Sequence, residues 1–223
     1  MSFYRGKKVL VTAGPTYERI DDVRYIGNFS SGKMGFAIAE EARKLGAVVT
    51  LVTGPTCLLC SSDIVRVDIE SAEEMYQAVT NVSDNQNLIV MSAAVADYTP
   101  KTKHNGKIKK NDDSMTVELV KTKDILKELG SKKSDKQTLV GFALESERLI
   151  EYAKGKLERK NCNIIVANKA NSPNSGFGKD INTITIIDDR NNITEVPTAN
   201  KQDIAKEILN YVSEYNEQPD SHF

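Results

Sequence analysis

Two closely spaced glycines ahead of a helical stretch could hold an anion. The segment Ser30-Ser31-Gly32-Lys33-Met34-Gly35 directly precedes apolar residues at helical spacing between 36 and 45. Glycine lets backbone N–H groups approach a phosphate closely, and the N-terminal end of a helix favours negative charge. The segment therefore predicts a phosphate site, for which a tight strand-to-helix turn without a ligand is the alternative.

The segment from Lys101 to Lys110 is a second cationic feature. Five of its ten residues are lysine, although the chain has 30 Lys and Arg against 31 Asp and Glu and a net charge of −1. A cluster this local favours either a solvated face or a flap that closes over a polyphosphate. The balanced overall charge argues against a nucleic-acid partner and against binding to an acidic membrane.

Small residues follow the apolar run at 88–91, in the order Ser92-Ala93-Ala94-Val95-Ala96-Asp97. They leave room for a ligand beside the backbone, and Asp97 could accept a hydrogen bond or hold a cation. Packing of small residues next to a helix-capping aspartate is the alternative interpretation.

Other candidates for chemistry are weaker. Cys57 and Cys60 have the spacing of a redox motif, but the sequence holds no second pair for zinc, and we interpret them as incidental loop cysteines. The two histidines, His104 and His222, are too few for a metal cluster. No Gly-x-x-x-x-Gly-Lys-Ser/Thr segment is present, which excludes a P-loop nucleotide site.

The segments that must position these residues alternate between strand-like and helix-like patterns. Apolar runs predict strands at 8–12, 48–52, 64–69, 88–91, 138–143 and 163–167. Helical spacing predicts helices at 36–45, after a capping box of Ser71 and Glu74, at 147–159 and at 201–215. This order is typical of an α/β fold with a Rossmann-like, mostly parallel sheet and helices on both faces. Ligands in such folds bind beyond the carboxyl ends of the strands.

Two segments depart from this alternation. Residues 99–121 are polar and Lys-rich before they alternate, and they predict a mobile Lys-rich flap with a hairpin strand. Residues 181–187 and 193–196 predict an antiparallel pair, a small antiparallel extension of the sheet. We find no linker, so 1–223 is expected to form a single domain.

The composition is that of an ordinary globular protein, with 39% hydrophobic residues among 223. No apolar run approaches the roughly 20 residues that span a membrane. No signal-peptide core follows the N-terminus, and three cysteines are too few for a disulfide scaffold. These observations predict a cytoplasmic protein with no membrane partner.

One enzymatic alternative is a short-chain-type NADP-dependent reductase. Residues 30–39 are similar to the glycine loop of short-chain dehydrogenases, and Tyr152 and Lys156 supply a Tyr-x-x-x-Lys pair. However, 17 residues separate Gly14 from Gly32, whereas a dinucleotide fingerprint closes within a few residues of its strand. A non-catalytic nucleotide-binding regulatory module is a third reading.

Taken together, the loops resemble the phosphopantothenate–cysteine ligase family of coenzyme A biosynthesis. The matching stretches lie in family order over nearly the whole chain: 11–16, 22–26 with Asn28, 30–35, Ala93 to Tyr98, Lys107-Ile108-Lys109-Lys110, 141–143 and Ala167-Asn168. The resemblance implies a single ligase domain, without the N-terminal flavin-dependent decarboxylase domain of many bacterial relatives, and a homodimer. It also implies CTP as co-substrate with Mg²⁺, an acyl-cytidylate intermediate, and small-molecule substrates, namely 4′-phosphopantothenate and L-cysteine. A flavin-dependent phosphopantothenoylcysteine decarboxylase domain is an implied partner.

The resemblance also implies roles for individual residues. Asn28 and Lys107 match the catalytic positions, Asn28 handling the acyl-cytidylate and Lys107 helping to form it. The nucleotide-binding set is Gly14, Ser31, Gly32, Gly35, Ala93, Asp97, Lys107, Lys123, Asp124, Ile125, Leu126, Phe142, Lys156 and Lys160. The phosphopantothenate-binding set is Arg24, Asn28, Ala93 and Ala94, with Arg24 reaching the site of a partner subunit. The sequence departs from the family pattern at Lys123, where many members have proline.

These roles are consistent with the chemistry of the residues. Nucleotidyl transfer needs aligned reactants and cations where charge develops, and Lys107 on a closing flap would supply one. The amide of Asn28 could donate a hydrogen bond to a carbonyl or phosphate oxygen without adding charge. We expect Lys107 and Asn28 to meet at one rim of the sheet.

Overall fold

The computed structural model describes residues 2–109, 114–145, 147–169 and 180–218. Lys110 and His222, which the sequence singled out, lie outside the described residues. Among the described helices, none is long and apolar enough to cross a membrane.

An eight-stranded sheet forms the centre of the fold, in the order β12-β11-β10-β9-β6-β1-β4-β5. The strands are β1 (Lys8–Ala13), β4 (Val48–Thr53), β5 (Val65–Asp68), β6 (Leu88–Met91), β9 (Thr138–Glu145), β10 (Ile164–Lys169), β11 (Ile181–Asp188) and β12 (Ile193–Asn200). The pairs from β5 to β10 are parallel, and β11 and β12 extend the sheet antiparallel. The predicted mostly parallel sheet with an antiparallel extension is therefore confirmed.

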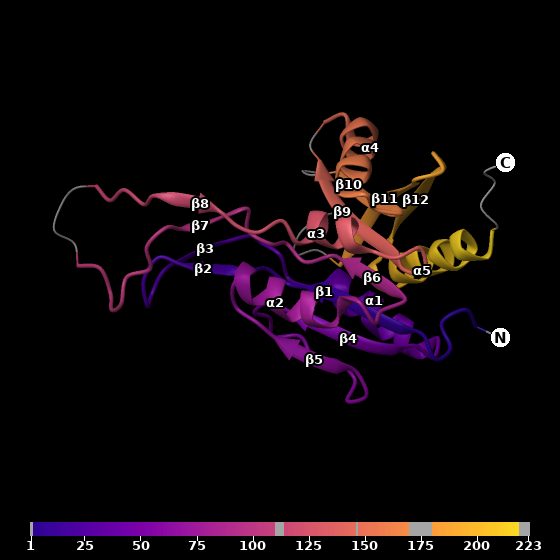
Figure 1. Cartoon of the computed structure of the whole chain (residues 1–223), viewed down its shortest axis with the longest axis horizontal. Coiled ribbons are helices and arrows are strands. Elements are labelled where there is room, and N and C mark those ends of the chain that lie inside the picture. Colours follow the sequence, from indigo (N-terminus) through magenta and orange to yellow (C-terminus); the bar gives the residue numbers. More distant parts are fainter. Residues whose placement is uncertain (1, 110–113, 146, 170–179, 219–223) are drawn as a thin grey trace.

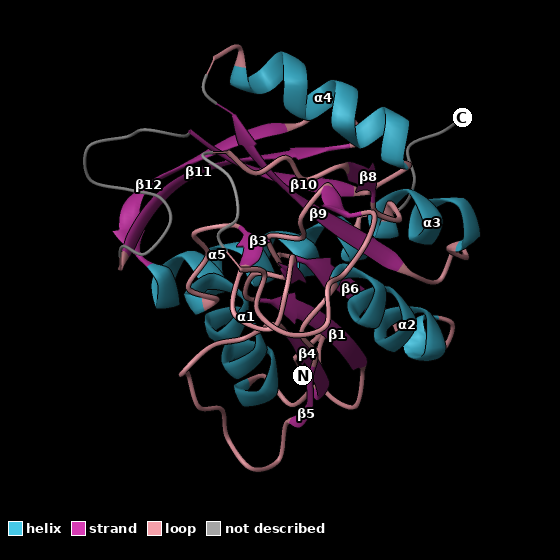
Figure 2. Cartoon of the chain, turned by 90° about the vertical axis from the view of Figure 1, so that its left-hand side faces the viewer, coloured by secondary structure: helices cyan, strands magenta, loops and turns pink. Residues whose placement is uncertain are grey.

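Helices cover both faces of this sheet (Figures 1 and 2). They are α1 (Lys33–Lys44), α2 (Ala72–Ser83), α3 (Ile125–Lys132), α4 (Leu149–Lys160) and α5 (Lys201–Glu217). Alternate residues of β1 enter two different cores: Val9 and Val11 pack with α1 and α5, and Leu10 packs with α2, α3 and α4. This alternation explains why the β1 run is apolar throughout, as a strand buried on both faces must be.

The order of the parallel strands creates a crevice beside β1. The chain proceeds outward from β1 to β4 and β5, and then returns to place β6, β9 and β10 on the other side of β1. The connections leaving the carboxyl ends of β1 and β6 therefore diverge to opposite sides of the sheet. In open α/β sheets this switch point is where ligands bind.

Four short strands build an arm that projects from the body of the molecule (Figure 1). They are β2 (Tyr17–Arg19) with β3 (Tyr25–Gly27), and β7 (Tyr98–Pro100) with β8 (Leu119–Lys121), each pair antiparallel. The β7–β8 pair confirms a hairpin strand in the Lys-rich region, and its mobility stays a prediction. The β2–β3 hairpin was not predicted.

Several helix boundaries follow local signals. Ser71 caps α2 by accepting from the Glu74 N–H at 3.3 Å, and the Glu74 carboxylate accepts from the Ser71 N–H, so the predicted capping box is present. Helix α3 was not predicted. It begins at the N-cap Asp124, whose carboxylate accepts from the Lys127 N–H at 3.0 Å.

Candidate functional site

A cavity of about 720 Å³ lies at the carboxyl ends of β1, β6, β9 and β10, within the range of small-ligand sites. Its wall combines the turn before α1, the loop after β6, the start of α3, the end of β9 and one side of α4. It is lined by Asn28, Ser30–Gly35, Met91–Val95, Asp97, Tyr98, Lys121–Leu126, Phe142–Leu144, Lys156, Lys160, Asn168, Asn182 and Lys201. Most of the nucleotide-binding residues implied by the resemblance are brought together here.

The two glycines of the turn before α1 have different structural roles. Gly32 is the N-cap of α1 and has a left-handed backbone, with φ of 77°. A side chain there would be strained, so glycine is required to turn the chain into the helix. Gly35 faces β1: a Cβ at this position would lie 2.6 Å from Ala13 Cβ, 2.7 Å from Ser92 Oγ and 2.9 Å from the Thr12 carbonyl oxygen. Gly35 therefore allows α1 to approach the sheet closely, and it lines the cavity through its backbone.

Replacement of Gly35 by alanine should destabilise the protein by about 1–3 kcal/mol, because the added methyl group meets backbone and packed atoms that cannot move away. The free energy of unfolding in urea measures the effect. Gly155→Ala is the matched control: it lies inside α4, where the new Cβ would meet only the guanidinium end of Arg159 closer than 3 Å. That control should stabilise the protein by about 0.5–1 kcal/mol, and equal effects at both glycines would contradict the packing role of Gly35.

The loop after β6 is bound tightly to the loop after β1. Ser92 Oγ donates to the Thr12 carbonyl at 2.6 Å, and the Ala94 N–H donates to the Gly14 carbonyl at 2.9 Å. Gly14 does not line the cavity but lies under Gly32, whose Cβ position is 3.2 Å from the Gly14 nitrogen. The small residues after β6 are thus needed for close contact between the two loops, and Ala93 and Ala94 also line the cavity.

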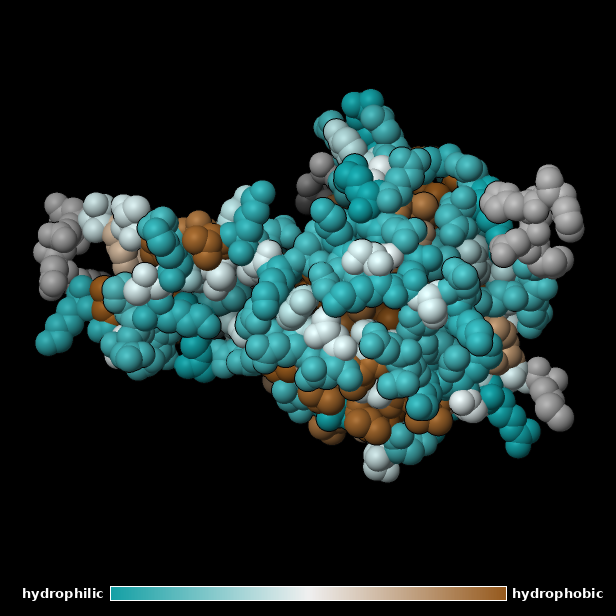
Figure 3. All heavy atoms as spheres, viewed as in Figure 1, coloured by the Kyte–Doolittle hydropathy of each residue, from teal (hydrophilic) through white to brown (hydrophobic). Residues whose placement is uncertain are grey.

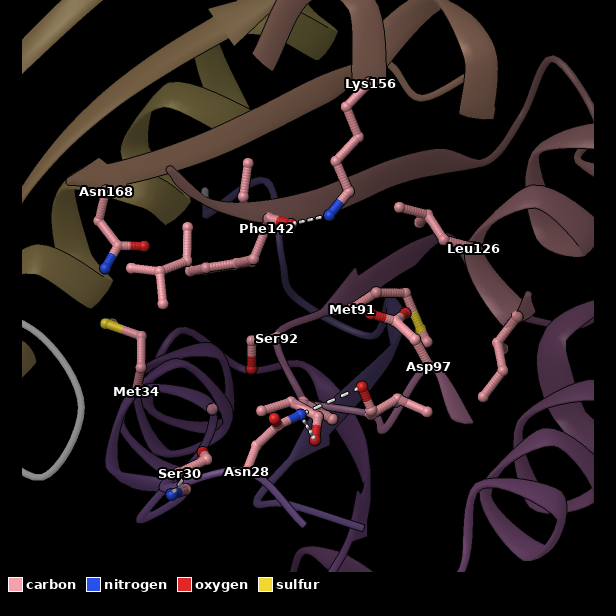
Figure 4. Close-up of a pocket in the computed structure, with 18 of the residues that line it drawn as sticks. Asn28, Ser30, Met34, Met91, Ser92, Asp97, Leu126, Phe142, Lys156 and Asn168 are labelled. Atoms are coloured by element: carbon pink, nitrogen blue, oxygen red, sulfur yellow. Dashed lines mark hydrogen bonds between the residues drawn. The ribbon is translucent and has the colours of Figure 1, made fainter. Parts of the chain in front are cut away.

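Asn28 follows β3 directly and lies on the cavity wall (Figure 4). Its amide nitrogen donates to the carbonyl oxygens of Ala94 at 3.1 Å and Val95 at 3.2 Å. Carbonyl oxygens only accept hydrogen bonds, so the orientation of the amide is fixed by its partners. The NH₂ group of Asn28 is thus used by these two carbonyls in this structure, and its donation to a substrate stays a prediction. Its amide oxygen, an acceptor, is the group left for a ligand.

The cavity is strongly cationic although the whole chain is nearly neutral. Six lysines line it against two aspartates, Asp97 and Asp124. Lys156 is largely buried and its ammonium donates to the Phe142 carbonyl at 2.7 Å (Figure 4). Burial, together with the positive charge of Lys160, lowers the pKa of Lys156. Lys160 pairs with Asp124, the N-cap of α3.

The segment Lys123-Asp124-Ile125-Leu126 lines the cavity, and two of its side chains have contacts elsewhere. The Lys123 ammonium pairs with Glu73 at 2.7 Å and lies 4.3 Å from the ring centre of Tyr76, and Glu73 raises the pKa of Lys123. Ile125 is buried in the core beneath α3. The lysine that replaces the usual proline therefore leaves the helix cap intact, and its charge is held by α2.

The opposite side of the cavity holds a second group of polar residues. Figure 4 shows Asn168 and Met34 there, across from Leu126 and Asp97. Lys33 at the start of α1 pairs with Asp180 at 2.5 Å, and the backbone N–H of Lys201 at the start of α5 donates to the Asp180 carbonyl at 2.9 Å. Lys33, Met34 and Asn168 lie in stretches that the sequence singled out, whereas Asp180 and Lys201 were not predicted.

Lys107 and Arg24 do not line this cavity. Both lie in the arm, where Lys107 lines a separate hollow of about 470 Å³ with Ile20 and residues 102, 104–108 and 115–118. The Arg24 guanidinium pairs with Asp21 and also donates to the Ile108 carbonyl at 3.1 Å. The expectation that Lys107 and Asn28 meet at one rim of the sheet is therefore not met within a single chain.

Two hydrogen bonds from the tip of the β2–β3 hairpin explain the position of the Lys-rich segment. The Asp21 carboxylate accepts from the Ile108 N–H at 3.0 Å, and Asp22 accepts from the Gly106 N–H at 2.7 Å. The hydrogen bond from Arg24, with those from backbone N–H groups, holds the pKa of Asp21 well below its usual range. The tip of the β2–β3 hairpin thus fixes residues 106–108 in the arm.

The two residues that favoured a reductase, Tyr152 and Lys156, do not meet at the cavity. Lys156 lines the cavity, but Tyr152 does not, and its ring lies beside the Arg148 guanidinium on the surface.

Cys57 is exposed and Cys60 is half-buried. In the described ranges, no group of three or more His, Cys, Asp or Glu side chains could hold a metal ion.

Asp97 is the acidic group of the cavity best suited to a divalent cation. Its carboxylate makes no hydrogen bond or ion pair that is seen among the described residues, whereas Asp124 is occupied by Lys160. Mg²⁺ commonly takes one or two carboxylates and completes its shell with water and substrate phosphates. A single open carboxylate beside the predicted phosphate site fits that pattern.

Comparison with known proteins places these features in a family. A family model described as "DNA/pantothenate metabolism flavoprotein C-terminal domain" matches residues 4–215. The chain is 45% identical over 214 residues to "Coenzyme A biosynthesis bifunctional protein CoaBC" of Bacillus subtilis, covering 96% of this chain and 52% of that protein. The chain thus spans about half the length of the curated relatives it matches.

Solved structures agree with this placement. The crystal structure of the C-terminal domain of a CoaBC protein superposes with a TM-score of 0.82 at 44% identity, covering 96% of this chain and 97% of that one. A complex of a Cab2 mutant with phosphopantothenate-cysteine gives a TM-score of 0.76 at 18% identity, covering 96% and 89% of the two chains. The latter likeness shows the fold alone.

Proposed function

The chain belongs to the family of the DNA/pantothenate metabolism flavoprotein C-terminal domain, and we propose that it is a phosphopantothenate–cysteine ligase. It joins 4′-phosphopantothenate and L-cysteine in coenzyme A biosynthesis, with CTP as co-substrate. The observation that carries the proposal is the lysine-lined cavity at the switch point of the sheet, with Asn28 on its wall. A nucleoside triphosphate and a phosphorylated acid are both anionic, and six lysines provide the matching charge.

In the first stage, the carboxylate oxygen of phosphopantothenate attacks the α-phosphorus of CTP. A new O–P bond forms, the bond to the β-phosphate bridging oxygen breaks, and pyrophosphate leaves with the electron pair. The products are an acyl-cytidylate and pyrophosphate. Lys156 and Lys160 supply positive charge along the nucleotide, and the turn at Gly32 directs the N-terminus of α1 at a phosphate.

Asp97 would hold a Mg²⁺ ion together with the phosphates of CTP. The ion would neutralise charge on the triphosphate in the first stage. The side chain is exposed to the cavity and can reach such an ion without breaking another contact seen in the described residues.

In the second stage, the amine of L-cysteine attacks the acyl carbon, an amide bond forms and CMP leaves with the bonding electrons. The amine loses one proton in this step, and the proton passes to water. The amide oxygen of Asn28 accepts a hydrogen bond from the incoming amine and orients its lone pair toward the acyl carbon. Ala94 and Val95 fix that oxygen in place by binding the NH₂ group of the same amide.

We place Lys107 and Arg24 at the cavity of a second copy of the chain in a homodimer. The arm that carries them extends away from the body, and large apolar side chains are exposed on it (Figures 1 and 3). Phe29 at the base of the arm is 95% exposed, and Val23 at the hairpin tip is 60% exposed. Apolar side chains gathered on one exposed surface are a common mark of a protein–protein interface. Exchange of arms would bring a Lys107 to each cavity.

A flavin-dependent decarboxylase, either a domain or a separate partner, would consume the product. Phosphopantothenoylcysteine retains the carboxylate of cysteine, which such an enzyme removes. The relatives named as bifunctional proteins of coenzyme A biosynthesis support this pairing.

The test is pyrophosphate release from each nucleoside triphosphate with phosphopantothenate, with and without L-cysteine. We expect CTP to give about one pyrophosphate per site without cysteine and continuous turnover with it. Absence of cysteine-dependent turnover with both CTP and ATP would favour a regulatory nucleotide-binding module. Tight binding of NADPH in a fluorescence titration would instead favour a reductase.

A further inference from the structure

Two neighbouring carboxylates at the tip of the β2–β3 hairpin hold the backbone on either side of Lys107. The Asp22 carboxylate accepts from the Gly106 N–H at 2.7 Å, and the Asp21 carboxylate accepts from the Ile108 N–H at 3.0 Å. Gly106 and Ile108 are the residues directly before and after Lys107. Lys107 is therefore fixed through both of its neighbours in the chain.

Asp21 is itself held firmly. Its side chain is buried, and its other carboxylate oxygen accepts from the backbone N–H groups of Val23 and Arg24, both at 2.8 Å. The Arg24 guanidinium adds a charge-assisted hydrogen bond from Nε at 3.0 Å. The Asp21 carboxylate cannot turn away from Ile108 without losing several of these hydrogen bonds.

Two further contacts tie the same stretch to the hairpin. The Arg24 guanidinium donates to the Ile108 carbonyl at 3.1 Å, and the His104 N–H donates to the Ile20 carbonyl at 3.1 Å. Ile108 is thus held through both its N–H and its C=O group. Since β2 of the hairpin also lies beside β7 in the arm (Figure 1), residues 104–108 are part of the folded arm.

Gly106 turns the chain immediately before Lys107. Its backbone is left-handed, with φ of 77°, and a Cβ there would meet no atom within 4 Å. Glycine is therefore required by the backbone conformation and not by close packing. Glycine also has the greatest backbone freedom of any residue, and the hydrogen bond from its N–H to Asp22 restricts that freedom here.

The side chain of Lys107, in contrast, is exposed. Its ammonium makes no hydrogen bond or ion pair that is seen in the described part of the chain, so its charge is available to a ligand. A lysine side chain loses rotamer entropy when it binds, and a backbone that had to be ordered at the same time would add to that loss. A backbone fixed in advance removes the second loss and limits the directions in which the ammonium can reach.

We propose that Asp21 and Asp22 are positioning residues for Lys107: they set the backbone from which its ammonium reaches the triphosphate of a bound nucleotide. Neither carboxylate touches the substrate, and both act through the residues next to Lys107. The proposal rests on the ligase function, and it holds whether the arm serves the cavity of its own chain or that of a second copy.

The test is a double-mutant cycle between Asp22→Ala and Lys107→Ala. It measures the single-turnover rate of pyrophosphate release from saturating CTP and phosphopantothenate without cysteine. Asp22→Ala should slow this rate about 3- to 10-fold, as expected for the loss of one hydrogen bond, and leave the dissociation constant of CTP within about twofold. In the Lys107→Ala background the same substitution should cause no further loss, because the group that Asp22 positions is gone.

Two variants separate the hydrogen bond from other effects of Asp22. Asp22→Asn keeps an oxygen that can accept from Gly106, and it should retain about half or more of the wild-type rate. Asp135→Ala removes an exposed carboxylate from the connection between α3 and β9, and it should leave the rate unchanged in both backgrounds.

Asp21→Asn should slow the first stage at least as much as Asp22→Ala, again only where Lys107 is present. The reason is that it weakens the contact with Ile108 and the ion pair with Arg24 together. Its thermal midpoint is measured alongside because Asp21 is buried.

Amide hydrogen exchange of the full chain, followed residue by residue by NMR, reports on the contact without any turnover. The Gly106 amide should exchange about 3- to 10-fold faster in Asp22→Ala than in wild type, and at the wild-type rate in Lys107→Ala.

Equal slowing of pyrophosphate release by Asp22→Ala in both backgrounds would overturn the positioning role, and so would a wild-type rate in Asp22→Ala. A loss in Asp22→Asn as large as that in Asp22→Ala would overturn it as well, since the hydrogen bond would not then explain the effect. A wild-type chain that releases no pyrophosphate from any nucleoside triphosphate would instead remove the ligase function, and hydrogen exchange would still report whether Asp22 holds Gly106.

Discussion

Replacement of Lys107 by alanine should abolish pyrophosphate release from CTP and phosphopantothenate while leaving the fold intact. The side chain is exposed in the arm, so its truncation should change the free energy of unfolding by no more than about 0.5 kcal/mol. A cation positioned where charge develops on the leaving pyrophosphate is typically worth about 10²–10³ in rate. Phosphate-sensor measurements of pyrophosphate, after pyrophosphatase treatment, follow the first stage directly.

The matched control is Lys103→Ala, which removes the same charge from the same exposed segment. It should retain nearly full activity, since long-range steering by one exposed lysine is screened by salt. Full activity of Lys107→Ala would remove Lys107 from the mechanism. Equal losses at Lys103 and Lys107 would instead indicate that the segment acts only through its net charge.

Because Lys107 lies in the arm, a separate experiment must show whether it acts at the cavity of its own chain or at the cavity of the partner subunit. Co-expression of Lys107→Ala with Asn28→Asp distinguishes the two arrangements. If Lys107 acts on the partner, a mixed dimer has one cavity with both native residues, and an equal mixture should recover about one quarter of wild-type activity. No recovery would show that each arm serves its own chain.

The sheet could be predicted from the sequence because each of its parallel strands is a short apolar run between helical patterns. The same logic missed α3. That helix is only eight residues long and contains Gly130, which is usually a sign of a helix end. In the structure a Cβ at Gly130 would lie 1.8 Å from the Lys160 carbonyl oxygen, so glycine is there to let α3 approach α4.

The site was predictable where its residues follow strands in the parallel sheet. Asn28 lies in the connection that follows β1, Asp97 lies beyond the carboxyl end of β6, and Phe142 lies within β9 near its carboxyl end. The fold class predicts a ligand at this edge of the sheet. Asn182 and Lys201 had no such signal, because the antiparallel extension and α5 reach the cavity only through tertiary packing. Lys107 was misplaced for a related reason: the contacts of Asp21 and Asp22 that hold its segment join residues more than 80 positions apart.

Asn28→Asp should impair the second stage more than the first. The amide NH₂ of Asn28 donates to the carbonyls of Ala94 and Val95. A carboxylate has no NH₂ group, so one of its oxygens would face these two carbonyl oxygens and both hydrogen bonds would be lost. A negative charge beside the incoming cysteine would also stabilise its ammonium form, which has no lone pair for attack. The neutral amide oxygen of Asn28 orients the amine without that effect.

The expected signature is a burst of pyrophosphate of about one equivalent per site, followed by slow release of CMP, with the acyl-cytidylate detected by mass spectrometry. A loss of roughly 10²-fold or more in the second stage is consistent with a misplaced reacting group. Asn105→Asp is the control: it makes the same change of charge at an exposed position in the arm and should leave both stages unchanged. If Asn28→Asp lost both stages equally, the residue would act in assembling the cavity. The loss of activity would then be explained without a hydrogen bond from the cysteine amine to Asn28.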